Sequence, residues 1–291
     1  MVVDGNHLCY RAYYKFSNMK TLDGIKTAIT YGAPYILESL IRKLAPDKVI
    51  VVFDSARHSF RTDLLPDYKH REPKLGFDKE DFFRQRDELI KIFGYLGLPI
   101  VKKEGFEADD LIYLVTKRLQ VNETEVVIVS GDKDFNQMVN KYVWVWNTSK
   151  DFKITYYNMF AKIGYSPNQC VDYLCLIGDD SDNIPGIKGI GEKRAVDFLK
   201  EFSSIRNFLK DKESKFGKLD KAMVRESYQI SRKLINLDIF YRKFLKSEKI
   251  PYLINPKGVN LKELKKICAK YEINTFTKPD FLATYQSLEN H

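Results

Sequence analysis

Carboxylate side chains occur in tight clusters along this 291-residue chain, each beside a short apolar run. The clusters are Asp4; Asp54; Glu107, Asp109 and Asp110; Asp132 and Asp134; and Asp179, Asp180 and Asp182. Taken singly, each has an ordinary structural interpretation, because an aspartate can cap a helix and first-turn carboxylates complement the helix dipole. If the clusters converge in one pocket, their like charges raise one another's pKa values and oppose folding.

Divalent cations would resolve this conflict of charge, because oxygen-rich sites suit Mg²⁺ or Mn²⁺. The clusters hold more carboxylates than one Mg²⁺ can use, which favours two ions. Two such ions about 3.5–4 Å apart fit the hydrolysis of a phosphodiester bond. No other catalytic group competes, since the four histidines, His7, His58, His70 and His291, are scattered and form no Ser/His/Asp or Cys/His arrangement.

The elements that must position these carboxylates alternate between strand and helix. Short β-branched runs at 2–3, 49–53 and 126–129 predict buried parallel strands, and amphipathic segments around 26–44, 79–96 and 108–119 predict helices. This pattern predicts a doubly wound α/β domain, in which ligands bind beyond the carboxyl ends of the strands. Asp4, Asp54 and Asp132 each follow one of these strands, so they are expected at that edge.

Two segments depart from the alternation. Residues 66–88 mix positive charge with aromatic side chains, and from about 166 the chain reads as mostly helical. Within that helical part, the run 182–195 contains three glycines and three basic residues: Gly186, Lys188, Gly189, Gly191, Lys193 and Arg194. Its backbone N–H groups, at the start of a helix from about 192, can form an anion-binding nest. We interpret it as a phosphate-gripping hairpin rather than an ordinary Gly-rich turn.

Composition limits the remaining classes of function. The chain has 48 Lys and Arg against 39 Asp and Glu, a formal net charge of +9, which suits a nucleic acid partner or simply solubility. No pair among the four cysteines has CxxC spacing, so a zinc site is not expected. The start resembles no signal peptide, and the longest apolar run is too short to cross a membrane. These features predict a cytoplasmic protein.

The motifs resemble, in order and over about residues 1–245, those of the 5′ nuclease family: phage flap endonucleases and the 5′ nuclease domain of bacterial DNA polymerase I. They begin at Asp4, Tyr68, Glu107, Ser130 and Gly178. The resemblance implies a mostly parallel α/β sheet flanked by helices, with a helical arch, followed by a helix-hairpin-helix region. The expected domains are 1–165, with the arch at about 66–88, then 166–250, and a C-terminal extension at 251–291.

The resemblance also implies a role for each candidate residue. Those expected to hold the first metal are Asp4, Asp54, Glu107, Asp109 and Asp132; those for the second are Asp134, Asp179 and Asp182, with Asp110 acting through water. Lys69 and Arg11 would contact the scissile phosphate. Tyr68 and Arg71 would bind DNA nearby, although relatives place this arginine three residues after the lysine. The hairpin would hold downstream duplex and a potassium ion.

The function implied is a monomeric, two-metal 5′ nuclease that uses Mg²⁺, with Mn²⁺ as a substitute. It would cut DNA at 5′ flaps, nicks or free 5′ ends, including RNA–DNA hybrids at primers, alongside replication proteins. Three alternatives stay open: a non-catalytic binder of branched DNA, a PIN-like ribonuclease and a metal-dependent phosphatase. A mere binder has no use for Asp134, Asp179 and Asp182, and the other two classes have no use for the hairpin.

Overall fold

A single six-stranded sheet lies at the centre of the described structure, a computed structural model that describes residues 1–55, 60–70, 76–120, 123–148, 150–246 and 256–290. The strands lie in the order β3-β2-β1-β4-β5-β6, and only β6 runs antiparallel to its neighbour within the described residues. Their bounds are β1 Val2–Asp4, β2 Ile50–Val52, β3 Ile100–Val101, β4 Val126–Val129, β5 Val143–Asn147 and β6 Phe152–Ile154. The predicted mostly parallel α/β sheet is therefore confirmed.

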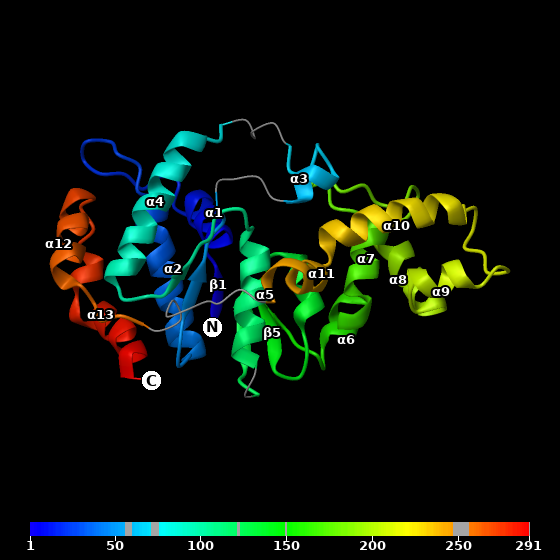
Figure 1. Ribbon diagram of the computed structural model, residues 1–291. Coiled ribbons are helices and arrows are strands. Elements are labelled where there is room, and N and C mark those ends of the chain that lie inside the picture. Colours follow the sequence, from blue (N-terminus) through cyan, green and yellow to red (C-terminus); the bar gives the residue numbers. More distant parts are fainter. Residues whose placement is uncertain (56–59, 71–75, 121–122, 149, 247–255, 291) are drawn as a thin grey trace.

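Alternate residues of the short central strands face opposite sides of the sheet, and each side has its own core. Val3 and Val51 pack with one group of helices: α1 Gly5–Lys15, α2 Ala28–Leu44, α4 Lys79–Tyr95, α12 Leu261–Lys270 and α13 Pro279–Gln286. Val2 and Ile50 pack on the other side with α5 Ala108–Leu119 and the helical region (Figure 1). Both faces are covered, so parallel strands made of continuous apolar runs are stable here.

The described part of the chain after 155 contains helices and no strand, as expected. Before α12, the helices of this part are α6 Met159–Ile163, α7 Cys170–Ile177, α8 Glu192–Phe202, α9 Ile205–Lys210, α10 Lys221–Ile235 and α11 Leu237–Phe240, with short turns between them. Their buried aromatic and aliphatic side chains continue the core around α5. The helical region is therefore packed on the sheet domain and not tethered loosely to it.

The predicted arch at about 66–88 is only partly described. Residues 71–75 lie outside the described residues, and the segment before them contains the short helix α3 Phe60–Leu64. From residue 79 onward the chain forms α4, which packs against α2 and whose Gln85 accepts a hydrogen bond of 2.8 Å from the backbone of Ile29. Residues 79–88 therefore belong to the core layer, and the arch between the two helices stays a prediction.

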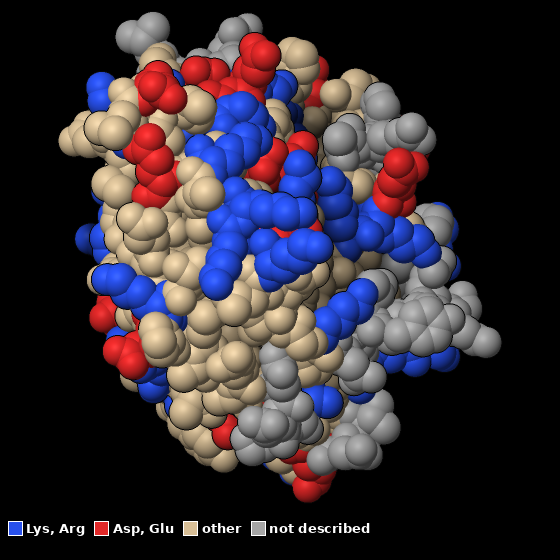
Figure 2. All heavy atoms as spheres, turned by 90° about the vertical axis from the view of Figure 1, so that its left-hand side faces the viewer, with Lys and Arg blue, Asp and Glu red and all other residues tan. Residues whose placement is uncertain are grey.

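The C-terminal helices cover α2 and α4 on the side opposite the helical region. Helix α12 buries Leu264 and Ile267, while its lysines Lys262, Lys265 and Lys266 are exposed. Figure 2 shows that Lys and Arg side chains gather over this side of the molecule. Positive charge is thus not confined to the strand-end edge. Across the described ranges, no helix is both long and apolar enough to span a membrane.

Candidate active site

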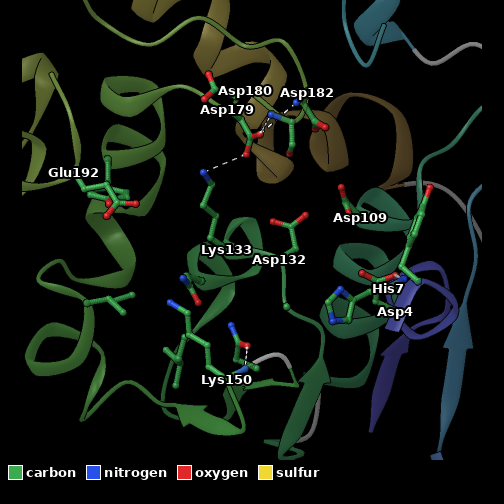
Figure 3. A pocket seen from close by; sticks show the side chains of 18 of the residues that line it. Asp4, His7, Asp109, Asp132, Lys133, Lys150, Asp179, Asp180, Asp182 and Glu192 are labelled. Atoms are coloured by element: carbon green, nitrogen blue, oxygen red, sulfur yellow. Dashed lines mark hydrogen bonds and ion pairs between the residues drawn. The ribbon is translucent and has the colours of Figure 1, made fainter. Parts of the chain in front are cut away.

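A cleft of about 1570 Å³ opens at the carboxyl ends of the central strands. Its lining includes most of the predicted carboxylates: Asp4, Asp54, Asp109, Asp132, Asp179 and Asp182. The first four come from strand ends and the start of α5, and the last two come from the loop 178–184 of the helical region. Figure 3 shows Asp4, Asp109 and Asp132 facing that loop across the cleft. The structure therefore brings together carboxylates that are far apart in sequence.

Two strand-end carboxylates are held by hydrogen bonds. Asp4 accepts from the backbone N–H of His7 at 2.9 Å and from the hydroxyl of Ser130 at 2.8 Å. Asp54 accepts from the backbone N–H of Ala108 at 2.6 Å and from the side-chain amide of Asn6. Because both oxygens of each carboxylate have a partner, the two side chains are fixed before any ligand arrives.

Burial and mutual repulsion work against ionisation of this cluster. Burial raises the pKa of Asp4 to about 6, although its hydrogen bonds oppose the shift. The pKa values of Asp109 and Asp134 are raised well above the usual range, first by burial and then by neighbouring carboxylates, of which Asp132 is one for both. The site therefore carries negative charge that the fold alone does not balance, and a cation bound there would stabilise it.

Two lysines partly balance the negative charge around the cleft. Lys69 Nζ lies 2.6 Å from a carboxylate oxygen of Glu107 and 3.8 Å from one of Asp182. Lys133 Nζ lies 3.3 Å from a carboxylate oxygen of Asp179. Burial alone would lower the pKa of Lys69, but Glu107 and other carboxylates hold it well above its usual range. Lys69 is therefore a fixed positive charge at the edge of the cleft, as a phosphate contact requires.

The donor set fits a hard divalent cation held in an open site. Within the described residues, no three His, Cys, Asp or Glu side chains are already grouped closely enough to enclose an ion. The carboxylate oxygens instead line a shared cleft, with the thiol of Cys170 buried outside it. Mg²⁺ keeps several waters and is usually bound by one or two carboxylates together with substrate phosphate, so an open lining suits it better than a closed cage.

Asp110 was predicted to act on a metal ion through water, and this role stays a prediction. Its carboxylate is buried and accepts two hydrogen bonds from the guanidinium of Arg61, at 2.7 and 2.8 Å. The Arg61 Nε also donates to the backbone carbonyl of Leu234 at 2.9 Å, which ties α3 and α5 to α10. Asp110 is not among the residues that line the cleft. Asp110 therefore joins the two regions of the protein.

We expect Asp110→Asn to lower the free energy of unfolding by about 3–5 kcal/mol, because the buried guanidinium of Arg61 loses the carboxylate that accepts two of its hydrogen bonds and keeps the longer ion pair with Glu107. Urea unfolding followed by far-UV circular dichroism measures this change. The double variant Asp110→Asn/Arg61→Met should be destabilised by less than the sum of the two single effects. A normal urea midpoint combined with a raised metal requirement would mean that Asp110 acts on the metal ion and not mainly on the fold.

The structure places the other predicted DNA-contacting residues, Tyr68, Arg11 and Arg71, in different surroundings. Tyr68 is 6% exposed and its hydroxyl lies 3.0 Å from Glu107 and 3.2 Å from Asp182, and its predicted contact with DNA stays a prediction. Arg11 is half-buried on α1 and does not line the cleft, so its phosphate contact stays a prediction. Arg71 lies outside the described residues.

The predicted hairpin has the backbone geometry that its glycines suggest. A Cβ at Gly186 would lie 2.3 Å from the carbonyl oxygen of Ile177, and Gly189 has a φ of 82°. Arg194 donates a hydrogen bond of 2.5 Å to the carbonyl of Gly189, so it braces the turn. Lys188, Gly191 and Lys193 are exposed, and Lys193 lies on the cleft wall. Contacts between these residues and DNA stay predictions.

Sequence reasoning assigned no role to three side chains that shape the site: Asn6, Lys133 and Arg61. Asn6 follows Asp4 by two residues, and Lys133 lies between Asp132 and Asp134. This closeness to candidate metal ligands could have identified both residues from the sequence. Arg61 had no such signal, because a separation of 49 positions in the sequence hides its pairing with Asp110.

Family models match nearly the whole of this architecture. The model of the N-terminal resolvase-like domain of 5′-3′ exonucleases matches residues 1–164, and the model of their C-terminal SAM fold matches residues 165–250. The chain belongs to the 5′-3′ exonuclease family. This nuclease is 35% identical over 236 residues to a 5′-3′ exonuclease of Aquifex aeolicus, which covers 81% of this chain and 80% of the relative.

Similar proteins include larger enzymes. This chain is 36% identical over 241 residues to the thermostable DNA polymerase I of Thermus thermophilus. The match covers 80% of this chain and 28% of the polymerase. Among solved structures, the bacteriophage T5 flap endonuclease with DNA and metal ions has a TM-score of 0.71 at 20% identity and 98% coverage of both chains. Human GEN1 with Holliday junction DNA has a TM-score of 0.57 at 15% identity, over 98% of this chain and 70% of that one. These likenesses support the fold.

Proposed function

We propose that this 5′ nuclease hydrolyses phosphodiester bonds of DNA at 5′ flaps, nicks and free 5′ ends, using two Mg²⁺ ions, and that it removes flaps or primers in replication. One observation carries the proposal: carboxylates from the strand ends and from the loop 178–184 line a single cleft with Lys69 at its edge. The T5 enzyme of similar fold carries DNA and metal ions in its structure, and these partners fit the basic charge and the open carboxylate lining.

The residues divide the work between holding cations and holding the phosphate. Asp4, Asp54, Asp109 and Asp132 are the candidates for one ion, and Asp179 with Asp182 and Asp134 are the candidates for the other. When bound, such ions activate water and neutralise charge that develops on the phosphate. Lys69 would contact the same phosphate, held in reach by Glu107. The hydrogen bonds on Asp4 and Asp54 keep these carboxylates oriented while the reaction proceeds.

A cleavage assay tests this function directly. The substrates are a 5′-labelled flap, a nicked duplex, an RNA–DNA hybrid and single-stranded RNA, each with Mg²⁺ and with EDTA. We expect Mg²⁺-dependent cuts near the 5′ end or the flap junction. Cleavage of single-stranded RNA alone would favour a ribonuclease, and tight binding of the flap without any cleavage would favour a DNA binder.

The hairpin makes a separate prediction about affinity. Lys193→Ala should weaken binding of all duplex sequences about equally, because a lysine on a hairpin grips backbone and does not read bases. The slope of log K against log[salt] should flatten by roughly 0.9 for each phosphate that the variant no longer neutralises. Fluorescence anisotropy at several salt concentrations measures the slope.

The matched control is Lys262→Ala on α12, an exposed lysine at the opposite end of the molecule (Figure 1). It should leave the slope unchanged. A loss of affinity limited to particular base sequences in Lys193→Ala would contradict the idea of backbone gripping.

A further inference from the structure

The turn that carries Lys69 has a backbone conformation that requires hydrogen bonds from residues outside the turn. Lys69 has a φ of 54°, in the left-handed region that a lysine rarely adopts. Within the turn, the backbone N–H of Tyr68 donates to Leu65 at 2.9 Å and that of His70 donates to Asp67 at 3.0 Å. These two bonds bend the chain, but they do not fix where the turn lies relative to the cleft.

The loop 178–184 supplies the missing support. The side-chain amide of Asn183 donates to the carbonyl of Asp67 at 2.9 Å and to the carbonyl of His70 at 2.6 Å. Both amide hydrogens are therefore used, and the two acceptors lie on either side of Lys69. The backbone N–H of Lys69 also donates to the carbonyl of Asp182 at 3.1 Å. Three hydrogen bonds thus fasten the Lys69 turn to two adjacent residues of this loop.

The supporting loop is itself well defined. The backbone groups of Asp179 and Ile184 exchange two hydrogen bonds, of 2.8 and 2.9 Å, which close the loop. Asn183 has a φ of 55°, which asparagine tolerates better than most residues, and this conformation directs its side chain away from the core. Asn183 is exposed, so it has no core-packing duty that would explain its two aimed donors.

We propose that Asn183 is a positioning residue for Lys69: it sets where the lysine ammonium lies in the cleft by holding the backbone on both sides of it. The inference rests on the proposed function, in which Lys69 contacts the phosphate. It also couples the two regions of the protein, because Asn183 belongs to the helical region and Lys69 to the segment after β2. Misplacing a catalytic charge by about 1 Å can slow a reaction by on the order of a hundredfold.

The test variant is Asn183→Gly, because glycine keeps the positive φ while both donors are removed. We expect single-turnover cleavage of a 5′ flap in saturating Mg²⁺ to slow by about tenfold or more. The dissociation constant for the flap and the Mg²⁺ concentration at half-maximal rate should stay within about twofold. The matched control His70→Ala keeps the carbonyl that Asn183 contacts, and it should cut at the wild-type rate.

A double-mutant cycle separates positioning of Lys69 from other effects. In the Lys69→Ala background, Asn183→Gly should cause no further loss, because the group that it positions is gone. An equal loss in both backgrounds, or a shifted Mg²⁺ midpoint, would overturn the inference. Such results would mean that Asn183 acts through Asp182 or the fold.

Hydrogen–deuterium exchange gives a readout that does not depend on cleavage. We expect the backbone amides of residues 66–70 to exchange several-fold faster in Asn183→Gly, with little change elsewhere. Unchanged exchange together with an unchanged rate would overturn the inference. If exchange is faster in Asn183→Gly but the separate variant Lys69→Ala cuts at the wild-type rate, the results count against the proposed role of Lys69 instead.

Discussion

Asp132→Ala is expected to abolish Mg²⁺-dependent cleavage of a 5′ flap while leaving affinity for the flap within a few-fold. Asp132 follows β4 and lines the cleft, where it shares the space with Asp4 and Asp109. It caps the next turn through a hydrogen bond of 2.8 Å from the backbone of Asp134, which aims the carboxylate. The imidazole of His7 also lines the cleft, but Mg²⁺ prefers oxygen ligands, so this ring does not replace the carboxylate and little residual rate is expected.

If Asp132→Ala were inactive because it had unfolded, its melting temperature would fall. We expect the opposite. In metal-free buffer, Asp132→Ala removes one of several like charges from a cluster in which burial and neighbouring carboxylates already raise the pKa values. The melting temperature without metal should therefore equal or exceed that of the wild type, even though one capping bond is removed. Differential scanning calorimetry in EDTA measures it, and the surface variant Asp87→Ala is the control for cleavage.

Two results would contradict this assignment. A substantial cleavage rate in Asp132→Ala with Mg²⁺ would remove Asp132 from the catalytic site. A large fall in melting temperature would show that the carboxylate serves the fold, and that the like-charge cluster is already relieved by its hydrogen bonds.

The sequence predicted the central strands because their apolar runs are continuous and buried on both faces. It did not predict β3, β5 or β6. Strand β3 has only two residues, and β6 reads Phe-Lys-Ile, without the continuous β-branched run that marks the equally short β1 and β2. Strand β5 is defined by its long-range pairing with β4, which local composition does not encode. The order of strands in the sheet also depends on these long-range pairings.

In the site too, the sequence predicted the residues that local patterns mark and missed those that depend on long-range contacts. Strand ends and acidic motifs located Asp4, Asp54 and Asp132, because the carboxyl edge of a parallel sheet is a property of the fold class. Side chains that act through a partner far along the chain could not be located in this way. The two examples are Asp110, whose arginine is 49 residues away, and Asn183, whose acceptor in Asp67 is 116 residues away.

Lys69→Ala is expected to bind a 5′ flap normally and to cut it at least about a hundredfold more slowly. Lys69 lies on the cleft wall with its ammonium held by Glu107, so its charge is already in place when a phosphate enters. An interaction made mainly in the transition state lowers the single-turnover rate without changing substrate affinity. Removal of one such preorganised electrostatic interaction typically costs on the order of 10²–10³ in rate. Single-turnover cleavage and anisotropy measure the two quantities.

The matched control is Lys79→Ala, which removes another lysine of the cleft wall, at the start of α4. If Lys69 acts on the reacting phosphate, its variant should stay slow at every salt concentration, because a preorganised interaction in the cleft is screened little. Lys79→Ala should show only a small loss of affinity that added salt removes. Equal, modest losses in both variants that salt abolishes in parallel would mean that Lys69 is one charge of a diffuse basic surface. In that case the proposed positioning of Lys69 by Glu107 and Asn183 would have no catalytic consequence.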